Sequence, residues 1–227
     1  MTKAPTPSLR DRNRLLARDV VLDAAERLLC ADPTASFSMR ALAADAGVGF
    51  ATPFNHFGSK NAIMQALSGR LIERMAAAFE AQAPAGDATD RVLAMGAIAV
   101  AHLLGQPDVH RAVVGSLGVA SATPGAVMVQ SRALWALALG DREGLSDDAR
   151  AAETVLATNL AVAFRGCLSF WTAGEIDDRH LHGMVEANML TTVLGFAAID
   201  RRQAVLLRLE EQTTDQGPQG VRQSGWP

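Results

Sequence analysis

The chain has 227 residues, of which 49% are hydrophobic and 5% aromatic, with a formal net charge of −3 at pH 7. This charge argues against a generic nucleic-acid binder, and two cysteines, Cys30 and Cys167, give no disulfide framework and suit a reducing compartment. The N-terminus has no apolar stretch typical of a signal peptide, and the longest apolar run, residues 92–104, is too short to cross a bilayer. We therefore expect a cytoplasmic protein without a membrane segment.

Charge is unevenly distributed along the chain. Residues 1–75 hold ten Lys or Arg and seven Asp or Glu, a balance of +3, whereas the remainder holds eleven and seventeen, a balance of −6. A basic first third on an acidic remainder suits contact of the N-terminal part with an anionic partner. Such asymmetry is common, so it selects no function by itself.

The first third of the chain alternates helical patterns with turn signals. Residues 1–13 include two prolines and are expected to form a flexible basic arm, and apolar spacing over 14–31 predicts an amphipathic helix. Ser38 is a suitable N-cap for a short helix to about residue 45, and Gly47 suits a tight turn over 46–48. A second short helix covers about 50–56, and Ser59 precedes a longer helix over 60–83.

Longer and more apolar helices are predicted after residue 87. The pattern places them at about 88–104, 108–119, 125–139, 147–173 and 178–208, and residues 211–227 are expected to be disordered. Because no run of strands is apparent and Ala and Leu dominate, the predicted fold class is all-α. Residues 14–74 then form one domain and residues 75–210 another.

Residues 38–57 have the spacing of a helix-turn-helix: a short helix, a three-residue turn and a second short helix. Six apolar side chains are placed to pack these helices onto the first helix: Leu42, Ala43, Ala46, Val48, Phe54 and Phe57. A recognition helix presents its N-terminal residues to base edges in the major groove. The residues left facing outward on the second short helix are Phe50, Ala51, Thr52, Asn55 and His56.

These outward residues have the chemistry that DNA requires. Phe50 and Ala51 suit apolar contact with thymine methyl groups, whereas Thr52 and His56 carry groups that bond phosphate. Lys60, at the start of the next helix, and Arg40 are further phosphate candidates. Each polar residue alone also fits an ordinary solvated surface, so the prediction depends on the whole set and its spacing. The glycines at 47 and 49 suggest a dinucleotide loop, but such a loop follows a strand and here a helix precedes.

From about residue 14 to residue 74 the chain resembles the DNA-binding domain of the tetracycline-repressor (TetR) family. The resemblance is carried by "VVLDAAERLL", "FSMRALAADAGV" and "ATPFNHFGSKNAIMQAL", about a quarter of the chain. It implies an all-α, nucleoid-associated homodimer that reads a palindromic DNA operator and binds an unknown small effector, without a cofactor or metal. By position it implies base or backbone contacts from Phe50, Ala51 and Phe54 and phosphate contacts from Thr52, His56 and Lys60.

Three residues depart from the family pattern. Phe54 stands where tyrosine is usual and lacks the hydroxyl that would bond phosphate. Pro53 replaces an aliphatic residue and requires that the recognition helix begin no earlier than about Gly49, because proline is tolerated only in a first turn. Gly49 replaces a polar cap and weakens that start. These departures predict modest operator affinity or reliance on the basic arm.

The body carries helices that are apolar on more than one face, which indicates burial from several sides. By resemblance, helices 147–173 and 178–208 pair with their symmetry mates in a dimer. The dimer candidates are Leu168, Trp171, Met189, Val193 and Phe196. The effector candidates, which fit ordinary core packing equally well, are His102, Met128, Trp135, Asn159, Phe164 and Cys167. A mostly apolar pocket would suit a hydrophobic effector.

The two alternative functions are an enzyme and an architectural DNA-binding factor. An enzyme is disfavoured because the chain has no G-x-S-x-G, H-E-x-x-H or C-x-x-C motif, and His180 and His182 point to different faces of a predicted helix. A TetR-like architectural factor that binds DNA without a small effector stays open. The sequence identifies neither the operator nor the effector, and repression is only what the resemblance implies.

Overall fold

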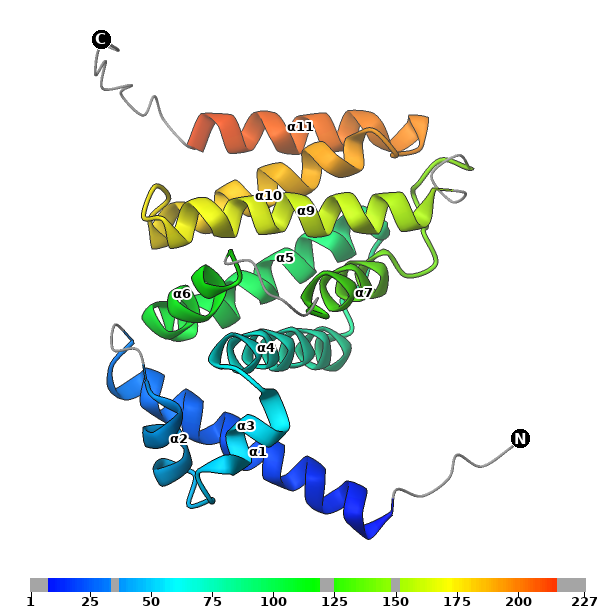
Figure 1. The fold of residues 1–227 in the computed structure, drawn as a ribbon. Coiled ribbons are helices and arrows are strands. Elements are labelled where there is room, and N and C mark those ends of the chain that lie inside the picture. Colours follow the sequence, from blue (N-terminus) through cyan, green and yellow to red (C-terminus); the bar gives the residue numbers. More distant parts are fainter. Residues whose placement is uncertain (1–7, 34–36, 119–124, 148–151, 216–227) are drawn as a thin grey trace. The chain divides into compact units, whose positions relative to one another are not determined.

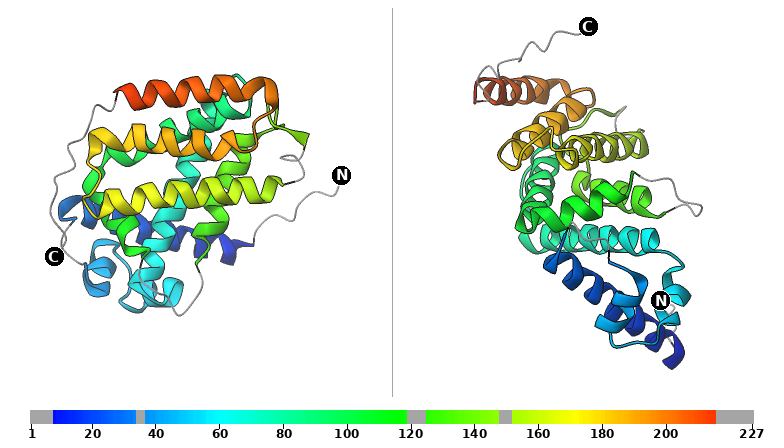
Figure 2. Two further views of the ribbon diagram at one scale, coloured as in Figure 1. Left: turned by 90° about the horizontal axis from the view of Figure 1, so that it is seen from above. Right: turned by 60° about the vertical axis from the view of Figure 1, so that its left-hand side comes forward.

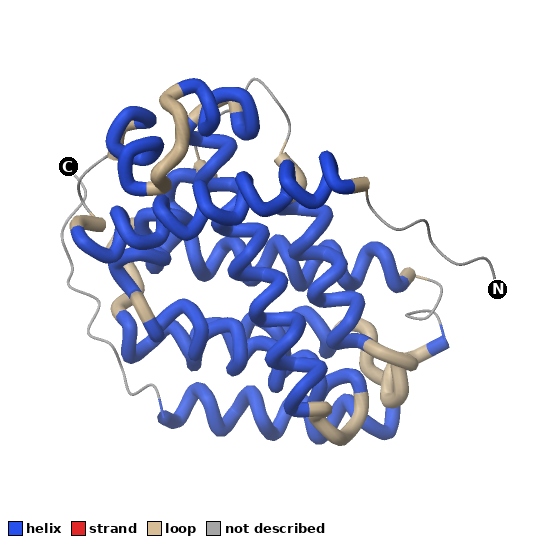
Figure 3. Tube along the Cα trace, turned by 90° about the horizontal axis from the view of Figure 1, so that it is seen from below, coloured by secondary structure: helices blue, strands red, loops and turns tan. Residues whose placement is uncertain are grey.

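The computed structural model describes residues 8–33, 37–118, 125–147 and 152–215, and its regular elements are all helices (Figure 1). Figure 3 shows these helices joined by loops, with no strand drawn among the described residues. The predicted all-α class is therefore confirmed. The helices are α1 (Leu9–Ala31), α2 (Met39–Asp45), α3 (Ala51–Phe57), α4 (Lys60–Gln82), α5 (Ala88–Gly105), α6 (Pro107–Ser116), α7 (Val127–Leu139), α9 (Glu153–Thr172), α10 (Asp178–Leu194) and α11 (Ile199–Asp215).

The chain folds into two compact units. The first unit comprises Met1–Glu73 together with Leu103–Met128, and the second comprises Arg74–His102 together with Val129–Pro227. The sequence placed everything from residue 75 to residue 210 in one body. The difference arises because α6 packs against α1, which brings a segment from beyond α5 into the first unit.

The core of the first unit is built on the apolar face of α1. Val21, Ala24 and Ala25 of α1 are fully buried there. They pack with buried residues contributed by three other helices: Leu42 of α2, Ile63, Met64 and Leu67 of α4, and Val109 and Val113 of α6. Burying each large aliphatic side chain contributes about 1.5–3 kcal/mol, so α6 adds substantially to the stability of this unit.

In the second unit, α9, α10 and α11 lie side by side, with α10 in the middle (Figures 1 and 2). The prediction of one helix over 178–208 is wrong, because α10 ends at Leu194 and α11 starts at Ile199. Between them the backbone pairs with a distant loop: Ser146 donates to the carbonyl of Phe196 at 2.9 Å, and Ala198 donates to that of Gly144 at 2.9 Å. These bonds replace helical ones and form an isolated antiparallel bridge between Leu145 and Ala197.

Two helix ends also differ from expectation. Helix α1 begins at Leu9, so residues 9–13 belong to a helix rather than to the predicted arm, while residues 1–7 lie outside the described part. Helix α11 continues to Asp215, so the first residues of the predicted tail, 211–215, are helical, and residues 216–227 lie outside the described part. Local sequence signals place helix ends poorly where no strong breaker is present.

Two helices have the length and hydropathy of membrane spans. They are α5 and residues Thr154–Thr172 of α9, each with a mean hydropathy of 1.2. The sequence analysis missed them because it considered only the longest apolar run, which ends wherever a polar residue intervenes. About half of each window is buried inside the fold, 50% and 44%, and core helices of globular proteins meet the same criterion, so the finding is weak evidence for a membrane.

Candidate nucleic-acid interface

Local sequence signals build the helix-turn-helix of the first unit. Ser38 caps α2, its hydroxyl accepting a hydrogen bond from the backbone N–H of Ala41 at 3.0 Å, as predicted. Gly47 takes a φ of +64° in the turn, a conformation that L side chains rarely adopt. Gly58 ends α3 with a φ of +76°, and Ser59 then caps α4, accepting from the N–H of Ala62 at 3.2 Å. These caps set the spacing between α2, α3 and α4.

Helix α3 turns a proline inward and two aromatic rings outward. Pro53 is the buried residue of this helix and is its third residue, where a missing N–H leaves no intrahelical bond unmade. The prediction that Phe54 packs into the core is wrong, because Phe54 is 42% exposed and Phe50 is 59% exposed. Their rings contact edge to face, with centroids 5.5 Å apart. The outer face of α3 is therefore apolar at its N-terminal end.

The other predicted contact residues of the two helices lie around this aromatic pair. Ala51 and Asn55 are exposed on α3, Thr52 and His56 are half-buried there, and Arg40 is exposed on α2. The Nδ1 atom of His56 is buried and has no hydrogen-bond partner within the described residues. Since a buried atom cannot reach a phosphate, any phosphate contact of His56 must use Nε2.

Lys60, a predicted phosphate contact, lies against an aromatic ring. Its ammonium lies 4.6 Å from the centre of the Phe37 ring, a cation–π contact worth about 0.5–1 kcal/mol at an exposed site. Desolvation by partial burial lowers the pKa of Lys60 from its ordinary value. A phosphate contact by Lys60 would have to compete with this arrangement.

Arginines of α1 contact the ends of α2 and α3, and an arginine of α4 contacts α1; the sequence analysis counted them only as charge. The Arg18 guanidinium lies 4.4 Å from the centre of the Phe57 ring and donates to the carbonyl of His56 at 2.8 Å, at the C-terminal end of α3. Arg27 pairs with Asp45 at the end of α2 at 2.8 Å. From α4, Arg70 reaches acidic residues of α1, with Asp19 at 3.1 Å. No local pattern identifies these residues, because their partners are distant in sequence.

The six predicted effector residues do not gather around a described cavity. Trp135 and Phe164 are buried against each other, with ring centroids 5.4 Å apart, and the indole N–H of Trp135 has no acceptor within the described residues. Cys167 is also buried, and desolvation raises the pKa of its thiol. The remaining three are dispersed: His102 lies with Nδ1 2.9 Å from the carbonyl oxygen of Ile98, Asn159 is exposed, and Met128 is 48% exposed in the first unit.

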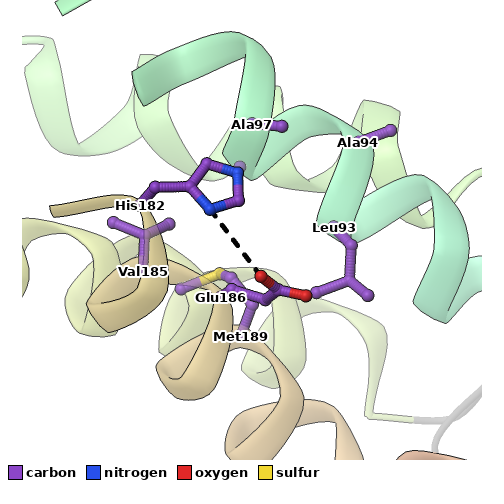
Figure 4. A pocket seen from close by; sticks show the side chains of 8 residues that line it. Leu93, Ala94, Ala97, His182, Val185, Glu186 and Met189 are labelled. Carbon is purple, nitrogen blue, oxygen red and sulfur yellow. Dashed lines mark ion pairs between the residues drawn. The ribbon is translucent and has the colours of Figure 1, made fainter. Parts of the chain in front are cut away.

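A cavity of about 250 Å³ lies elsewhere in the second unit, between α5 and α10. Figure 4 shows Leu93, Ala94 and Ala97 of α5 facing side chains of α10 across it. Sequence reasoning named none of its residues as ligand contacts. The reason is that Ala and Gly residues on one helix do not indicate a groove in the sequence. The groove becomes apparent only when the position of the neighbouring helix is known.

The predicted dimer residues are mostly core residues of their own chain. Leu168 is 6% exposed, and Trp171, Met189 and Val193 are fully buried, while Phe196 is half-buried. Helices that are apolar all round do not reveal from sequence which stripe faces inward. The stripe of α9 that faces outward carries Val155, Val162 and Phe170, each a little more than half exposed.

Comparison with known proteins agrees with this geometry. Residues 21–67 match the family model described as bacterial regulatory proteins, tetR family. The fold is similar to the crystal structure of a TetR transcriptional regulator from Rhodococcus sp. RHA1, with a TM-score of 0.66 and 21% identity over 79% of this chain and 97% of that one. No curated protein matches the chain.

Two further structures are more distant. One is a protein of unknown function from Rhodococcus sp. RHA1, with a TM-score of 0.49 and 23% identity over 87% of this chain and 100% of that one. The other is a putative transcriptional regulator from Streptomyces coelicolor A3(2), with a TM-score of 0.45 and 22% identity over 87% of this chain and 95% of that one. The family match at residues 21–67 confirms the resemblance seen in the sequence.

Proposed function

We propose that this TetR-family regulator binds a palindromic operator as a homodimer and represses transcription until a small molecule binds its second unit. The observation that carries the DNA-binding part is the helix-turn-helix itself. Helix α2, the turn at Gly47 and helix α3 follow one another at the required spacing, and α3 exposes a face that the described residues leave uncovered. Regulation by a ligand rests on the family and on the cavity in the second unit.

Apolar contact with bases is the reading mode that α3 supports best. Phe50 and Phe54 present rings at the outer face, and an aromatic ring discriminates thymine by packing on its methyl group. Phe54 has no hydroxyl to donate to a phosphate, so positioning on the backbone falls to other groups. Arg40 and Thr52 are the accessible candidates for those phosphate contacts.

A dimer follows from the small size of the reading head. Helix α3 has seven residues and touches only a few base pairs, so one copy gives little specificity. Two copies related by a two-fold axis would read two half-sites roughly 34–36 Å apart on DNA. The exposed stripe of α9 at Val155, Val162 and Phe170 is the surface that we assign to the partner, in place of the buried residues predicted from sequence.

Release by an effector would be a shift between two populations of the dimer. A ligand that binds the form with mis-spaced heads more tightly lowers operator affinity by the ratio of its two affinities. Couplings of this kind are typically about 1–3 kcal/mol, which corresponds to roughly 5–150-fold. The 250 Å³ cavity favours this mode over an architectural factor that has no ligand.

The first test is binding of the purified protein to DNA from its own upstream region, followed by fluorescence anisotropy over a range of salt. We expect selective binding that weakens steeply with salt, with a log–log slope of about −0.9 per phosphate contacted. Phe50→Ala and Phe54→Ala should each weaken selective binding by about tenfold, roughly 1.4 kcal/mol. The side chains are 59% and 42% exposed, so the folded state should be preserved.

Val129→Ala is the matched control, since Val129 is 59% exposed on α7 and belongs to the second unit. It should leave DNA binding unchanged. A more specific test replaces thymidine in the operator by deoxyuridine, which removes only the methyl group of the base. If the aromatic pair reads that methyl, the substitution should weaken the parent protein and have little further effect on Phe50→Ala. The proposed recognition of DNA would be refuted if the parent, Phe50→Ala and Phe54→Ala proteins each bound operator and unrelated DNA with equal affinity.

The dimer is tested separately by analytical ultracentrifugation. Val162→Asp places a charge in the centre of the α9 stripe and should produce monomers, because an unpaired charge is costly to bury at an interface. Val129→Asp is the control for an exposed valine outside that stripe. A Val162→Asp protein that stays dimeric would place the interface elsewhere.

A further inference from the structure

The cavity between α5 and α10 has a floor made of small residues. Ala94, Gly96 and Ala97 of α5 face α10, and a side chain added at Gly96 would bring its Cβ to 3.3 Å from a methyl carbon of Val185. The two helices therefore approach closely at Gly96 and leave a groove where the alanines lie. At about 250 Å³ the groove holds roughly eight water-sized groups, close to the lower end of known ligand pockets.

One acidic group stands over this apolar floor. Glu186 of α10 lines the groove with a side chain that is 25% exposed, and the walls beside it are Leu93, Val185 and Met189. Figure 4 shows its carboxylate between α10 and the alanines of α5. A partly desolvated carboxylate is costly unless a cation or hydrogen-bond donors face it.

The groove supplies little compensation for that charge. None of its lining residues is Lys or Arg, and the one that can become cationic is His182, one turn earlier on α10. His182 places Nδ1 3.7 Å from Oε2 of Glu186 (Figure 4), an ion pair when the imidazole is protonated but too long for a hydrogen bond. The groove thus places a carboxylate acceptor next to its apolar floor, and a bound ligand could supply the cation.

We propose that this groove binds a small organic cation, with its ammonium on the Glu186 carboxylate and its hydrocarbon part over Ala94 and Ala97. The proposal rests on the proposed function in that it names the effector class as a small apolar amine. An anion of the same size would be repelled by Glu186, and a neutral analogue would gain only the apolar contacts. Charge-assisted hydrogen bonds are about twice as strong as neutral ones, so the amine should be preferred.

The test is isothermal titration of the full-length protein, without DNA, with three probes of one chain length: n-hexylammonium, 1-hexanol and hexanoate. We expect n-hexylammonium to bind at least about tenfold more tightly than 1-hexanol and hexanoate to bind least. Glu186→Gln keeps the shape of the side chain and should abolish the preference for the amine over the alcohol. Glu175→Gln, which removes an exposed carboxylate from the segment before α10, is the matched control and should behave as the parent.

A second variant keeps the proposal falsifiable if Glu186→Gln fails to fold. Ala97→Leu fills the floor while retaining the carboxylate, and it should abolish binding of both the amine and the alcohol. The proposal is overturned if no probe binds, if alcohol and amine bind equally, or if amine binding survives both substitutions.

DNA binding is read in the separate anisotropy experiment, so the two failures can be told apart. Amine binding at Glu186 without any operator binding would overturn the proposed function and leave the site standing. Selective operator binding without amine binding would do the reverse.

Discussion

Arg18 is predicted to act on α3 through position rather than through its charge. Its guanidinium packs on the Phe57 ring at 4.4 Å and donates to the carbonyl of His56 at 2.8 Å. That carbonyl belongs to the last turn of α3, where backbone acceptors have no helical partner. Arg18 therefore closes the C-terminal end of the helix that carries Phe50 and Phe54.

The expected magnitude follows from these two contacts. A half-exposed cation–π contact is worth about 0.5–1 kcal/mol, and a hydrogen bond contributes about 0.5–1.5 kcal/mol net. Arg18→Met should therefore destabilise the docked end of α3 by about 1–2 kcal/mol, a factor of roughly 5–30 in a local opening equilibrium. Arg18→Lys keeps the charge but loses the planar stacking geometry and should lose most of the same free energy.

Native-state hydrogen exchange measures this opening directly. The amide of Gly58 donates to the carbonyl of Phe54 at 2.8 Å and reports the end of α3. We expect its exchange to accelerate by roughly 5–30-fold in both Arg18 variants and to stay unchanged in Arg14→Met, which removes an exposed charge one turn earlier on α1. Unchanged exchange in Arg18→Met would refute the positioning role. If Arg18→Lys alone behaved as the parent, charge rather than stacking would be the relevant property.

Three further substitutions and one thiol-labelling experiment have definite expected outcomes. Ser38→Ala removes the hydroxyl that caps α2 and should cost about 1 kcal/mol in urea unfolding, with Ser38→Asp restoring most of it. Gly47→Ala should cost about 1–2 kcal/mol through backbone strain alone, because φ is +64° and no atom lies within 4 Å of the added methyl group. Exposed Cys30 should react with Ellman's reagent in the native protein, whereas buried Cys167 should react only after unfolding. Val113→Ala should destabilise the first unit by about 2 kcal/mol, and a stability unaffected by it would contradict the role of α6 in that core.

The parts of the fold that sequence predicted well are those encoded by neighbouring residues. Ser38 and Ser59 cap helices that begin one residue later, and Gly47 takes the positive φ that its turn requires. Each of these signals acts over three or four residues, so no tertiary information is needed to read it. The same locality explains why the helix-turn-helix was found, whereas two of the side chains expected to face outward on α3, Thr52 and His56, are half-buried.

Predictions failed where the deciding partner lies far away in sequence. After Leu194 the backbone bonds to the loop around Ser146, a partner that residues 178–208 do not reveal, and the one local stop signal, Gly195 at the C-cap of α10, was not taken as a helix end. Phe54 was expected inside because an apolar residue at helical spacing suggests packing, yet Pro53 occupies the inward position and leaves Phe54 outside. In α9 and α10, neighbouring helices decide which apolar stripe faces inward, so most of the residues predicted for the dimer interface lie in the core instead.

The extent of the family match also shows that a local sequence pattern covers only part of a folding unit. The match contains α2, α3 and the turn between them, but it begins inside α1 and ends inside α4, at residue 67. The hydrophobic core of the first unit does not end there, because Val109 and Val113 of α6 cover residues of α1 and α4. The chain must pass through most of α5, which belongs to the second unit, before it returns with α6. A segment cut after residue 74 would lack Val109 and Val113 of that core, so a match that stops at residue 67 covers less than a folding unit.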